Sequence, residues 1–230
     1  MKINKTAILI FANSAQQEAV NKPFRKSSAL FDLLNKETIQ KVKRSGLPYF
    51  LFSEAEQKGE TFGERYTNAI QFVYDQGFEN VITVGNDTPQ LQTSQLIETA
   101  LKLEDNPIIL GPSKDGGYYM MGLNKSQFNF ESFLNLPWQT SQLTKHISRL
   151  LAVQKIKIVF LKMLTDIDSI SDIESVLNGF RSIGYTLKKI LLTLFSSEKN
   201  TISYSPFFSQ NTSKEINFNK GSPLLLPILN

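Results

Sequence analysis

The chain has 230 residues but no cysteine, and it contains a single histidine and a single tryptophan. Without cysteine it forms no disulfide, no thiolate zinc site and no cysteine nucleophile. This fits a reducing compartment, and we expect a cytoplasmic protein. His146 falls in an expected helix, where a surface or packing role is commoner than a ligand role. The sequence also lacks a Ser-His-Asp arrangement, a P-loop and a G-x-G-x-x-G turn.

A strong charge excess and long apolar runs are lacking as well. The 25 Lys and Arg residues exceed the 21 Asp and Glu residues by four, far from the dense basic stripe that nucleic-acid binding needs. No apolar run reaches transmembrane length. The opening stretch MKINKTAILIFA has a basic front but a short apolar part without a small-residue cleavage site. We therefore interpret it as a first core strand and not as a signal peptide.

Apolar runs typical of strands alternate with stretches of helical periodicity over residues 1–183. The expected strands are residues 6–12, 47–52, 81–84, 107–110, 118–123 and 156–161. The expected helices are residues 28–44, 61–77 with a Thr61/Glu64 capping box, a helix with Thr93 as its N-cap, residues 140–152, and a last helix with a Ser171/Glu174 capping box. This alternation predicts an α/β fold with a mostly parallel sheet.

The periodic pattern decays after residue 183, so we divide the chain into a domain at 1–183 and a C-terminal extension at 184–230. Residues 196–222 are rich in Ser, Asn and Thr, and the end, SPLLLPILN, is apolar. Such an extension packs either on its own domain or on another chain. A homo-oligomer is therefore one of the open possibilities.

Carboxylates follow three of the expected strands, at the edge where open α/β sheets bind ligands. Asp87 stands in VGNDTPQL, Asp115 in GPSKDGGYYMMGL, and Asp166 and Asp168 in LTDIDSISDIESV. Alternating positions on an extended segment let Asp166 and Asp168 face one site. Turn, hairpin and helix-dipole roles are the structural alternatives for Asp87, Asp115 and Asp168. Oxygen ligands without cysteine suit Mg²⁺ or Mn²⁺, ions that usually bind together with substrate phosphates.

Five motifs stand in the order and at the spacing of a known family: FGERYTNAIQFVYDQGF, VITVGNDTPQL, IILGPSKDGGYYMMGL, LPWQTSQL and LTDIDSISDIES. Over residues 5–183 the chain resembles the bacterial DUF2064 family, a glycosyltransferase-like group with the GT-A, nucleotide-diphospho-sugar transferase fold. The resemblance implies a three-layer α/β/α, Rossmann-like GT-A sandwich. It also implies a transferase that binds a nucleotide or nucleotide sugar through a divalent metal and acts on an unknown acceptor.

The resemblance also assigns roles to individual residues. Asp87 matches the acidic residue that stands where related GT-A enzymes keep a metal-binding D-x-D, and Asp166 matches a second metal position. Asp115 lies in the acceptor-side loop and is the expected catalytic residue. The expected substrate-binding residues are Phe11, Ala12, Asn13, Lys22, Asn86, Gly116, Gly117, Trp138 and Thr140.

The opening loop, residues 11–24, departs from the family pattern F-A-K-x-P-x-P-G-x-V-K-T-R-L. Asn13 replaces a lysine, Glu18 a glycine and Pro23 an arginine. Phosphate binding requires backbone amides and cations, so Glu18 brings the wrong charge if it faces a phosphate. Lys22 is among the nearby cations that would compensate.

These patterns allow four interpretations of the protein. The first is a metal-dependent transferase acting on a nucleotide sugar, and the second is a nucleotidyltransferase on the same fold, since fold analogy does not choose between them. The third is a catalytically degenerate relative that binds a nucleotide or a partner; a structure in which Glu18 fills the phosphate pocket would favour it. The fourth is an α/β domain whose acidic turns are purely structural.

Overall fold

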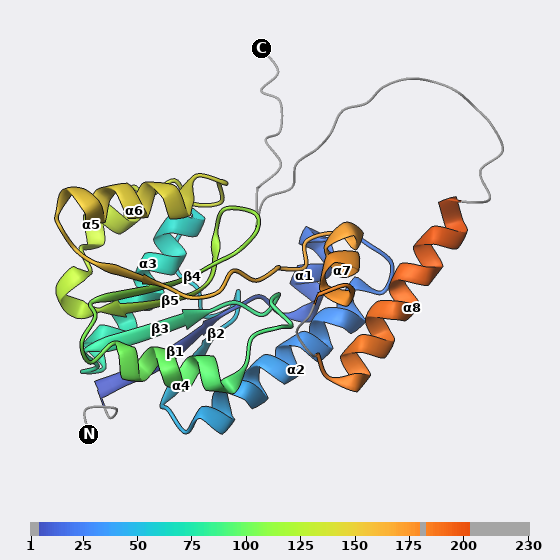
Figure 1. Ribbon diagram of the computed structural model, residues 1–230, viewed down its shortest axis with the longest axis horizontal. Helices are drawn as coiled ribbons and strands as arrows, with labels where there is room; N and C mark the ends of the chain where they lie inside the picture. Colours follow the sequence, from blue (N-terminus) through green and yellow to red (C-terminus); the bar gives the residue numbers. More distant parts are fainter. Residues whose placement is uncertain (1–4, 180–182, 203–230) are drawn as a thin grey trace, which may run out of the picture.

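The computed structural model describes residues 5–179 and 183–202. It contains a six-stranded sheet in the order β2-β1-β3-β5-β4-β6 (Figure 1). The strands are β1 (Thr6–Phe11), β2 (Tyr49–Phe52), β3 (Asn80–Val84), β4 (Ile108–Pro112), β5 (Tyr118–Asn124) and β6 (Ile158–Phe160). The helices are α1 (Ala15–Asn21), α2 (Ser27–Ser45), α3 (Phe62–Asp75), α4 (Thr93–Lys102), α5 (Phe130–Leu134), α6 (Leu143–Val153), α7 (Ile170–Leu177) and α8 (Tyr185–Ile202).

The sheet is mixed but mostly parallel, which confirms the predicted fold class. The pairs β1–β2, β1–β3 and β4–β6 are parallel, whereas β5 runs antiparallel to both β3 and β4. Every residue of β3 is buried, as the continuous apolar run VITV predicts for a central strand covered on both faces. β5 follows β4 through a short turn and therefore enters the sheet antiparallel, beside β3.

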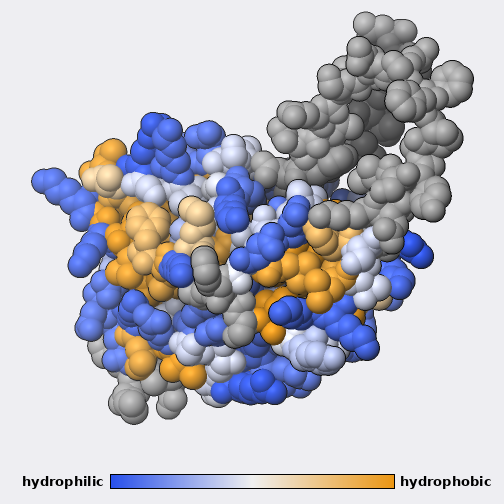
Figure 2. Space-filling model, turned by 45° about the vertical axis from the view of Figure 1, so that its right-hand side comes forward, coloured by the Kyte–Doolittle hydropathy of each residue, from blue (hydrophilic) through white to orange (hydrophobic). Residues whose placement is uncertain are grey.

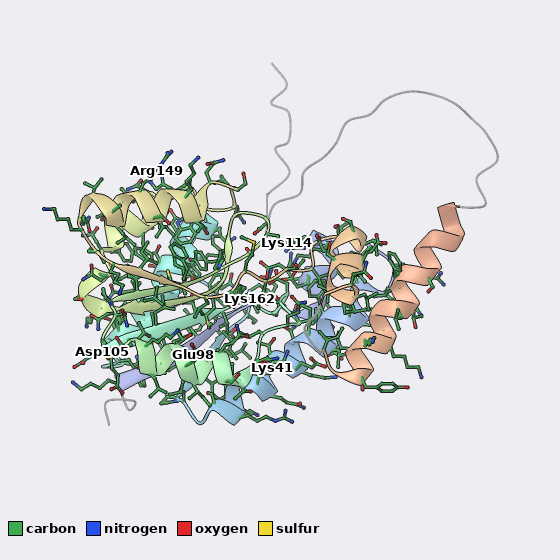
Figure 3. The ribbon with its side chains drawn as sticks, viewed as in Figure 1. Lys41, Glu98, Asp105, Lys114, Arg149 and Lys162 are labelled. Atoms are coloured by element: carbon green, nitrogen blue, oxygen red, sulfur yellow. The ribbon has the colours of Figure 1, made fainter. Side chains whose placement is uncertain are left out.

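Helices cover both faces of the sheet and produce the expected three layers (Figure 1). One face packs against α3 and α6 through residues such as Ile70, Val73 and Ile147. The opposite face packs against α2 and α4 through Val42 and Leu96. Charged side chains project outward from these helices, among them Arg149 on α6 and Glu98 on α4 (Figure 3).

A third apolar cluster lies beyond the end of the sheet, where α1, α2, α7 and α8 meet. Its buried members include Phe31 of α2, Ile173 of α7 and Leu187 and Leu191 of α8. α8 begins within the predicted extension, 184–230, and packs against α7 and α2. Residues 203–230, including the apolar end, lie outside the described residues, so the division into two parts stays a prediction.

Of the three helix caps that the sequence predicts, one is right and two are shifted. Thr61 and Glu64 form the predicted capping box of α3. The box of α7 is formed by Ser169 and Asp172, so the prediction of Ser171 and Glu174 was two residues late. α4 begins after Gln92, whose box partner is Gln95, and not after Thr93. Several polar residues near a helix start compete as caps, and the tertiary path of the preceding loop decides among them.

Helix α1 lies in the stretch that the sequence analysis treated as a loop. Ser14 is its N-cap, and the side chain of Ser14 accepts a hydrogen bond from the Gln17 amide at 3.2 Å.

The surface seen in Figure 2 mixes apolar patches with charged side chains. No helix in the described part of the chain combines the length and the apolar character that a membrane crossing needs.

Candidate functional site

A cleft of about 560 Å³ opens at one edge of the sheet. Phe11 and Val84, the last residues of β1 and β3, lie in its wall. β5 runs in the opposite direction, so its first residue, Tyr118, lies at the same edge. This is the carboxyl edge of the parallel strands, where α/β sheets place their ligands.

Most of the predicted site residues line this cleft. They are Phe11, Ala12, Asn13, Lys22, Asn86, Asp87, Asp115, Gly117, Trp138 and Thr140. Gly116 and Asp166 are not in its wall: Gly116 faces the backbone of Ser141, and Asp166 is buried beside the cleft, where it accepts a hydrogen bond from the Thr88 hydroxyl. The roles of all these residues stay predictions.

One side of the cleft is a cluster of aromatic rings. Phe62 and Tyr66 of α3 stack with centroids 5.6 Å apart, and the ring of Trp138 lies 5.0 Å from Tyr66. The Trp138 indole donates to the Phe133 carbonyl at 2.7 Å. Gly63 permits this packing, because a Cβ at that position would lie 2.7 Å from the Trp138 ring. The rings form an apolar wall of the kind on which flat ligands stack.

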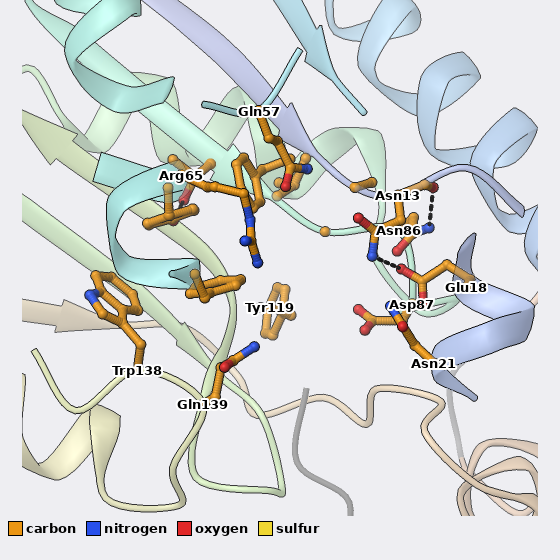
Figure 4. Close-up of a pocket in the computed structure, with 18 of the residues that line it drawn as sticks. Asn13, Glu18, Asn21, Gln57, Arg65, Asn86, Asp87, Tyr119, Trp138 and Gln139 are labelled. Atoms are coloured by element: carbon orange, nitrogen blue, oxygen red, sulfur yellow. Dashed lines mark hydrogen bonds between the residues drawn. The ribbon is translucent and has the colours of Figure 1, made fainter. Parts of the chain in front are cut away.

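Arg65 also projects from α3 into the cleft, between Gln57 and the aromatic wall (Figure 4). Its guanidinium donates to the Glu60 carbonyl at 2.7 Å. Arg65 and Lys22 are the two cations among the described residues that line the cleft, and the carboxylates there are Glu18, Glu54, Asp87 and Asp115. The cleft therefore carries more negative than positive side chains.

The other end of the cleft is an oxygen cage around the Lys22 ammonium. The Lys22 Nζ lies 2.7 Å from Asp168 Oδ1, 3.0 Å from Asp87 Oδ2 and 3.0 Å from the Ile167 carbonyl. Glu18 Oε2 lies 3.8 Å away. Lys22 itself is only 8% exposed. Three donors match three close oxygens, so the hydrogen-bonding capacity of the ammonium is used within the protein.

Electrostatics keep Lys22 charged despite its burial. Burial lowers the pKa of the Lys22 ammonium, but the carboxylates of Asp87, Asp168 and Glu18 outweigh this effect and raise the pKa above its ordinary value. The ring of Phe31 lies 4.9 Å from the ammonium and closes the cage on the apolar side. Lys22 is thus a permanent cation at physiological pH.

With Lys22 in place, the cage holds an ammonium, and its contacts have the lengths of ammonium–oxygen contacts and not those around a divalent ion. Charge-assisted N–H···O contacts measure about 2.7–2.9 Å, whereas Mg²⁺ requires oxygens at about 2.0–2.1 Å. The observed distances of 2.7 and 3.0 Å belong to the first class. Among the described residues, no group of three or more His, Asp or Glu side chains is arranged to hold a metal ion. In this arrangement the carboxylates of Asp87, Asp168 and Glu18 surround the Lys22 ammonium.

Hydrogen-bond donors of the opening loop also have partners within the protein. Glu54 accepts hydrogen bonds from the Ser14 backbone amide at 2.6 Å and from the Ser14 hydroxyl at 2.5 Å. Burial raises the pKa of Glu54, but these bonds lower it by more, so the net shift is downward. Asn13 holds Glu18 through a bond of 3.2 Å, drawn in Figure 4. A carboxylate thus occupies loop donors of the kind that phosphate oxygens use.

Asp115 belongs to the turn between β4 and β5. It accepts hydrogen bonds from the Gly117 amide at 3.0 Å and from the Ser113 hydroxyl. Gly116 has a φ of +92°, which favours glycine. The hairpin alternative for this motif is therefore confirmed, and Asp115 also lines the cleft, where it can meet a ligand.

Several cleft residues escaped the sequence analysis. The residues of α3 that line the cleft were used only to predict a helix and as part of a family motif, and Arg65 was not singled out. Gln57 and Glu54 lie in a polar loop after β2 that has no motif. The residues missed include Gln17, Asn21, Glu54, Gln57, Phe62, Arg65, Tyr66, Tyr119 and Gln139.

Residues 40–140 match the model of the family named "Uncharacterized protein conserved in bacteria (DUF2064)". The resemblance seen in the sequence is confirmed. The matched segment holds Asp87, Asp115, Arg65 and Trp138, and Lys22 and Asp168 lie outside it. None of the curated proteins matches the chain.

Solved structures share the fold of this chain. A Desulfovibrio desulfuricans G20 protein with the provisional name nucleotide-diphospho-sugar transferase has a TM-score of 0.72 at 19% identity, covering 84% of this chain and 98% of its own. Rv0371c from Mycobacterium tuberculosis H37Rv has a TM-score of 0.52 at 12% identity, covering 77% of this chain and 100% of its own. At these identities the likeness establishes the fold alone.

Proposed function

We propose that this cleft binds a nucleotide or a nucleotide sugar and that the protein is a transferase of the nucleotide-diphospho-sugar type. The observation that carries the proposal is the cleft of about 560 Å³ at the carboxyl edge of the sheet, with an aromatic wall facing a polar end. The base or sugar would stack on the partly exposed rings of Trp138 and Phe62. Arg65 would hold the phosphates, because a guanidinium binds phosphate oxygens through two parallel hydrogen bonds.

In the transfer reaction an acceptor hydroxyl attacks the anomeric carbon of the sugar. The bond from that carbon to the diphosphate oxygen breaks, and the nucleoside diphosphate leaves with the electron pair. Asp115 is the proposed base for the hydroxyl proton, since it lines the cleft. Arg65 would stabilise the negative charge on the leaving diphosphate. The predicted Mg²⁺ or Mn²⁺ at Asp87 and Asp166 stays untested, and no step here passes through it.

Product analysis tests this proposal. Nucleoside diphosphate released from a sugar donor marks the transferase, whereas diphosphate released from a nucleoside triphosphate marks a nucleotidyltransferase on the same fold. Arg65→Ala should weaken nucleotide binding at least tenfold by isothermal titration calorimetry. Arg149→Ala, on α6 outside the cleft, is the matched control and should leave binding unchanged. Equal affinities in the two variants would remove Arg65 from the site.

A catalytically degenerate binding protein is the second candidate, and the charges in the cleft favour it. Glu18 lies in the cleft wall, where it replaces the glycine of the family pattern, and Glu54 occupies the Ser14 donors. Four carboxylates face two cations in the described lining, which disfavours a diphosphate held without another cation. Saturable nucleotide binding without either product would identify this candidate.

A further inference from the structure

We infer that Lys22 takes the place of the divalent ion, so that this chain closes its acidic site with its own ammonium and needs no metal there. Lys22 directly follows α1 in the chain. Its ammonium bridges Asp87, in the loop after β3, and Asp168, in the segment before α7. These are acidic positions that the sequence assigns to a ligand-side edge. The inference concerns this cage alone and does not depend on which nucleotide the cleft binds.

Charge and geometry both support an ammonium in place of a metal ion. One ammonium contacts two carboxylates and one carbonyl, with a third carboxylate at 3.8 Å. A metal ion would have to displace this ammonium, and the lysine would then need another partner for its charge in a buried position. The described surroundings of Lys22 offer an aromatic face, Phe31, and the same carboxylates. The arrangement therefore favours Lys22 over an entering cation.

The cage is built by the fold and not by chance proximity of exposed side chains. The side chains of Lys22, Glu18 and Asp87 are each less than 10% exposed. The Ile167 amide donates to the Asp87 carbonyl at 2.9 Å, which ties the segment before α7 to the β3 loop. The Lys22 amide donates to the Glu18 carbonyl at 2.8 Å and continues α1 by one residue. Backbone bonds thus fix the cage partners independently of the ion pairs.

Manganese binding, measured by electron paramagnetic resonance, tests the inference without any need for activity. Free aqueous Mn²⁺ gives a signal that is lost when the ion is bound. The full-length wild type, titrated with Mn²⁺ alone, should leave the signal intact. Lys22→Met should bind Mn²⁺ at least tenfold more tightly than the wild type, because oxygen ligands without a cation suit this ion. Lys36→Met, an exposed lysine of α2, is the control and should behave like the wild type.

Two results would overturn the inference. One is Mn²⁺ binding by the wild type that Asp87→Asn abolishes, since the ion would then share the cage. The other is equal Mn²⁺ affinity in wild type and Lys22→Met, since Lys22 would then not exclude the metal. Binding by the wild type that survives Asp87→Asn lies elsewhere and leaves the cage closed, as proposed.

A second measurement covers the case in which Lys22→Met does not fold. The wild type is acetylated with and without Mn²⁺, and the modified lysines are identified by mass spectrometry. Lys22 should stay unmodified in both samples, whereas Lys36 should react in both. Modification of Lys22 only with Mn²⁺ would show that the ion expels it. A protein that binds neither Mn²⁺ nor any nucleotide loses the proposed function and keeps this inference.

Discussion

The replacement Lys22→Met is the perturbation whose stability effect the structure specifies most fully. Methionine retains the unbranched side chain against Phe31 but removes the charge that Asp87 and Asp168 share. Removing one partner of a buried ion pair costs about 3–5 kcal/mol, because the remaining charge stays buried without compensation. For a domain of this size about 1 kcal/mol corresponds to roughly 2–4 °C, so the melting temperature should fall by roughly 6–20 °C.

A double-mutant cycle separates the ion pair from simple loss of packing. Lys22→Met with Asp87→Asn removes a positive and a negative charge together, so the double variant should be more stable than Lys22→Met alone. Urea unfolding followed by circular dichroism gives the four free energies of unfolding. Lys36→Met removes only an exposed pair with Asp32 and should change stability by less than about 0.5 kcal/mol.

The reasoning is refuted if Lys22→Met unfolds within about 0.5 kcal/mol of the wild type. It is also refuted if adding Asp87→Asn lowers the stability of Lys22→Met further. In either case the cage would not be held by the charge of Lys22, and the closed acidic site would lose its main support.

Three further variants test the turn, the aromatic wall and a buried tyrosine. Gly116→Ala should lower the free energy of unfolding in urea by about 2–3 kcal/mol, because φ is +92° and the new Cβ would lie 2.1 Å from the Ser141 carbonyl oxygen. A loss below about 0.5 kcal/mol would contradict the turn geometry. Gly63→Ala should shift the Trp138 emission spectrum, since its Cβ would lie 2.7 Å from that ring, and an unchanged spectrum would count against this contact. Burial raises the pKa of the Tyr74 phenol, so the unfolded chain ionises first and stability should fall as pH rises above about 10. Tyr74→Phe should show a shallower fall between pH 8 and pH 11, and an identical slope would exclude Tyr74 as a source.

The sequence predicted the sheet and its flanking helices because their signals are local. Continuous apolar runs mark β1 and β3, and the Thr61/Glu64 box marks the start of α3. The same logic missed α1, whose sequence AQQEAVN has little apolar periodicity. Its Ser14 cap is held by Glu54, 40 positions away, and such tertiary contacts leave no local pattern.

The sequence pointed to an acidic residue of the cleft, but not to its partner. Strand-end positions singled out Asp87, which lines the cleft, and Asp166, which does not, while Lys22 was expected to hold phosphates from the opening loop. The Lys22–Asp87 contact joins residues 65 positions apart, and only the folded chain shows that the lysine turns toward the carboxylates. Arg65 was missed because its motif, FGERYTNAIQFVYDQGF, was used only to predict a helix and to support the family resemblance.

The central claim is that the cleft binds a nucleotide, and Trp138 tests it most directly. It is the single tryptophan of the chain and lines the cleft, so its fluorescence reports the bound state without a label. The protein is titrated with nucleoside diphosphates and nucleotide sugars in the presence of EDTA. The account predicts a saturable change for one nucleotide base that Arg65→Ala weakens. No change with any nucleotide in a folded sample, either in EDTA or after Mn²⁺ replaces EDTA, would contradict it.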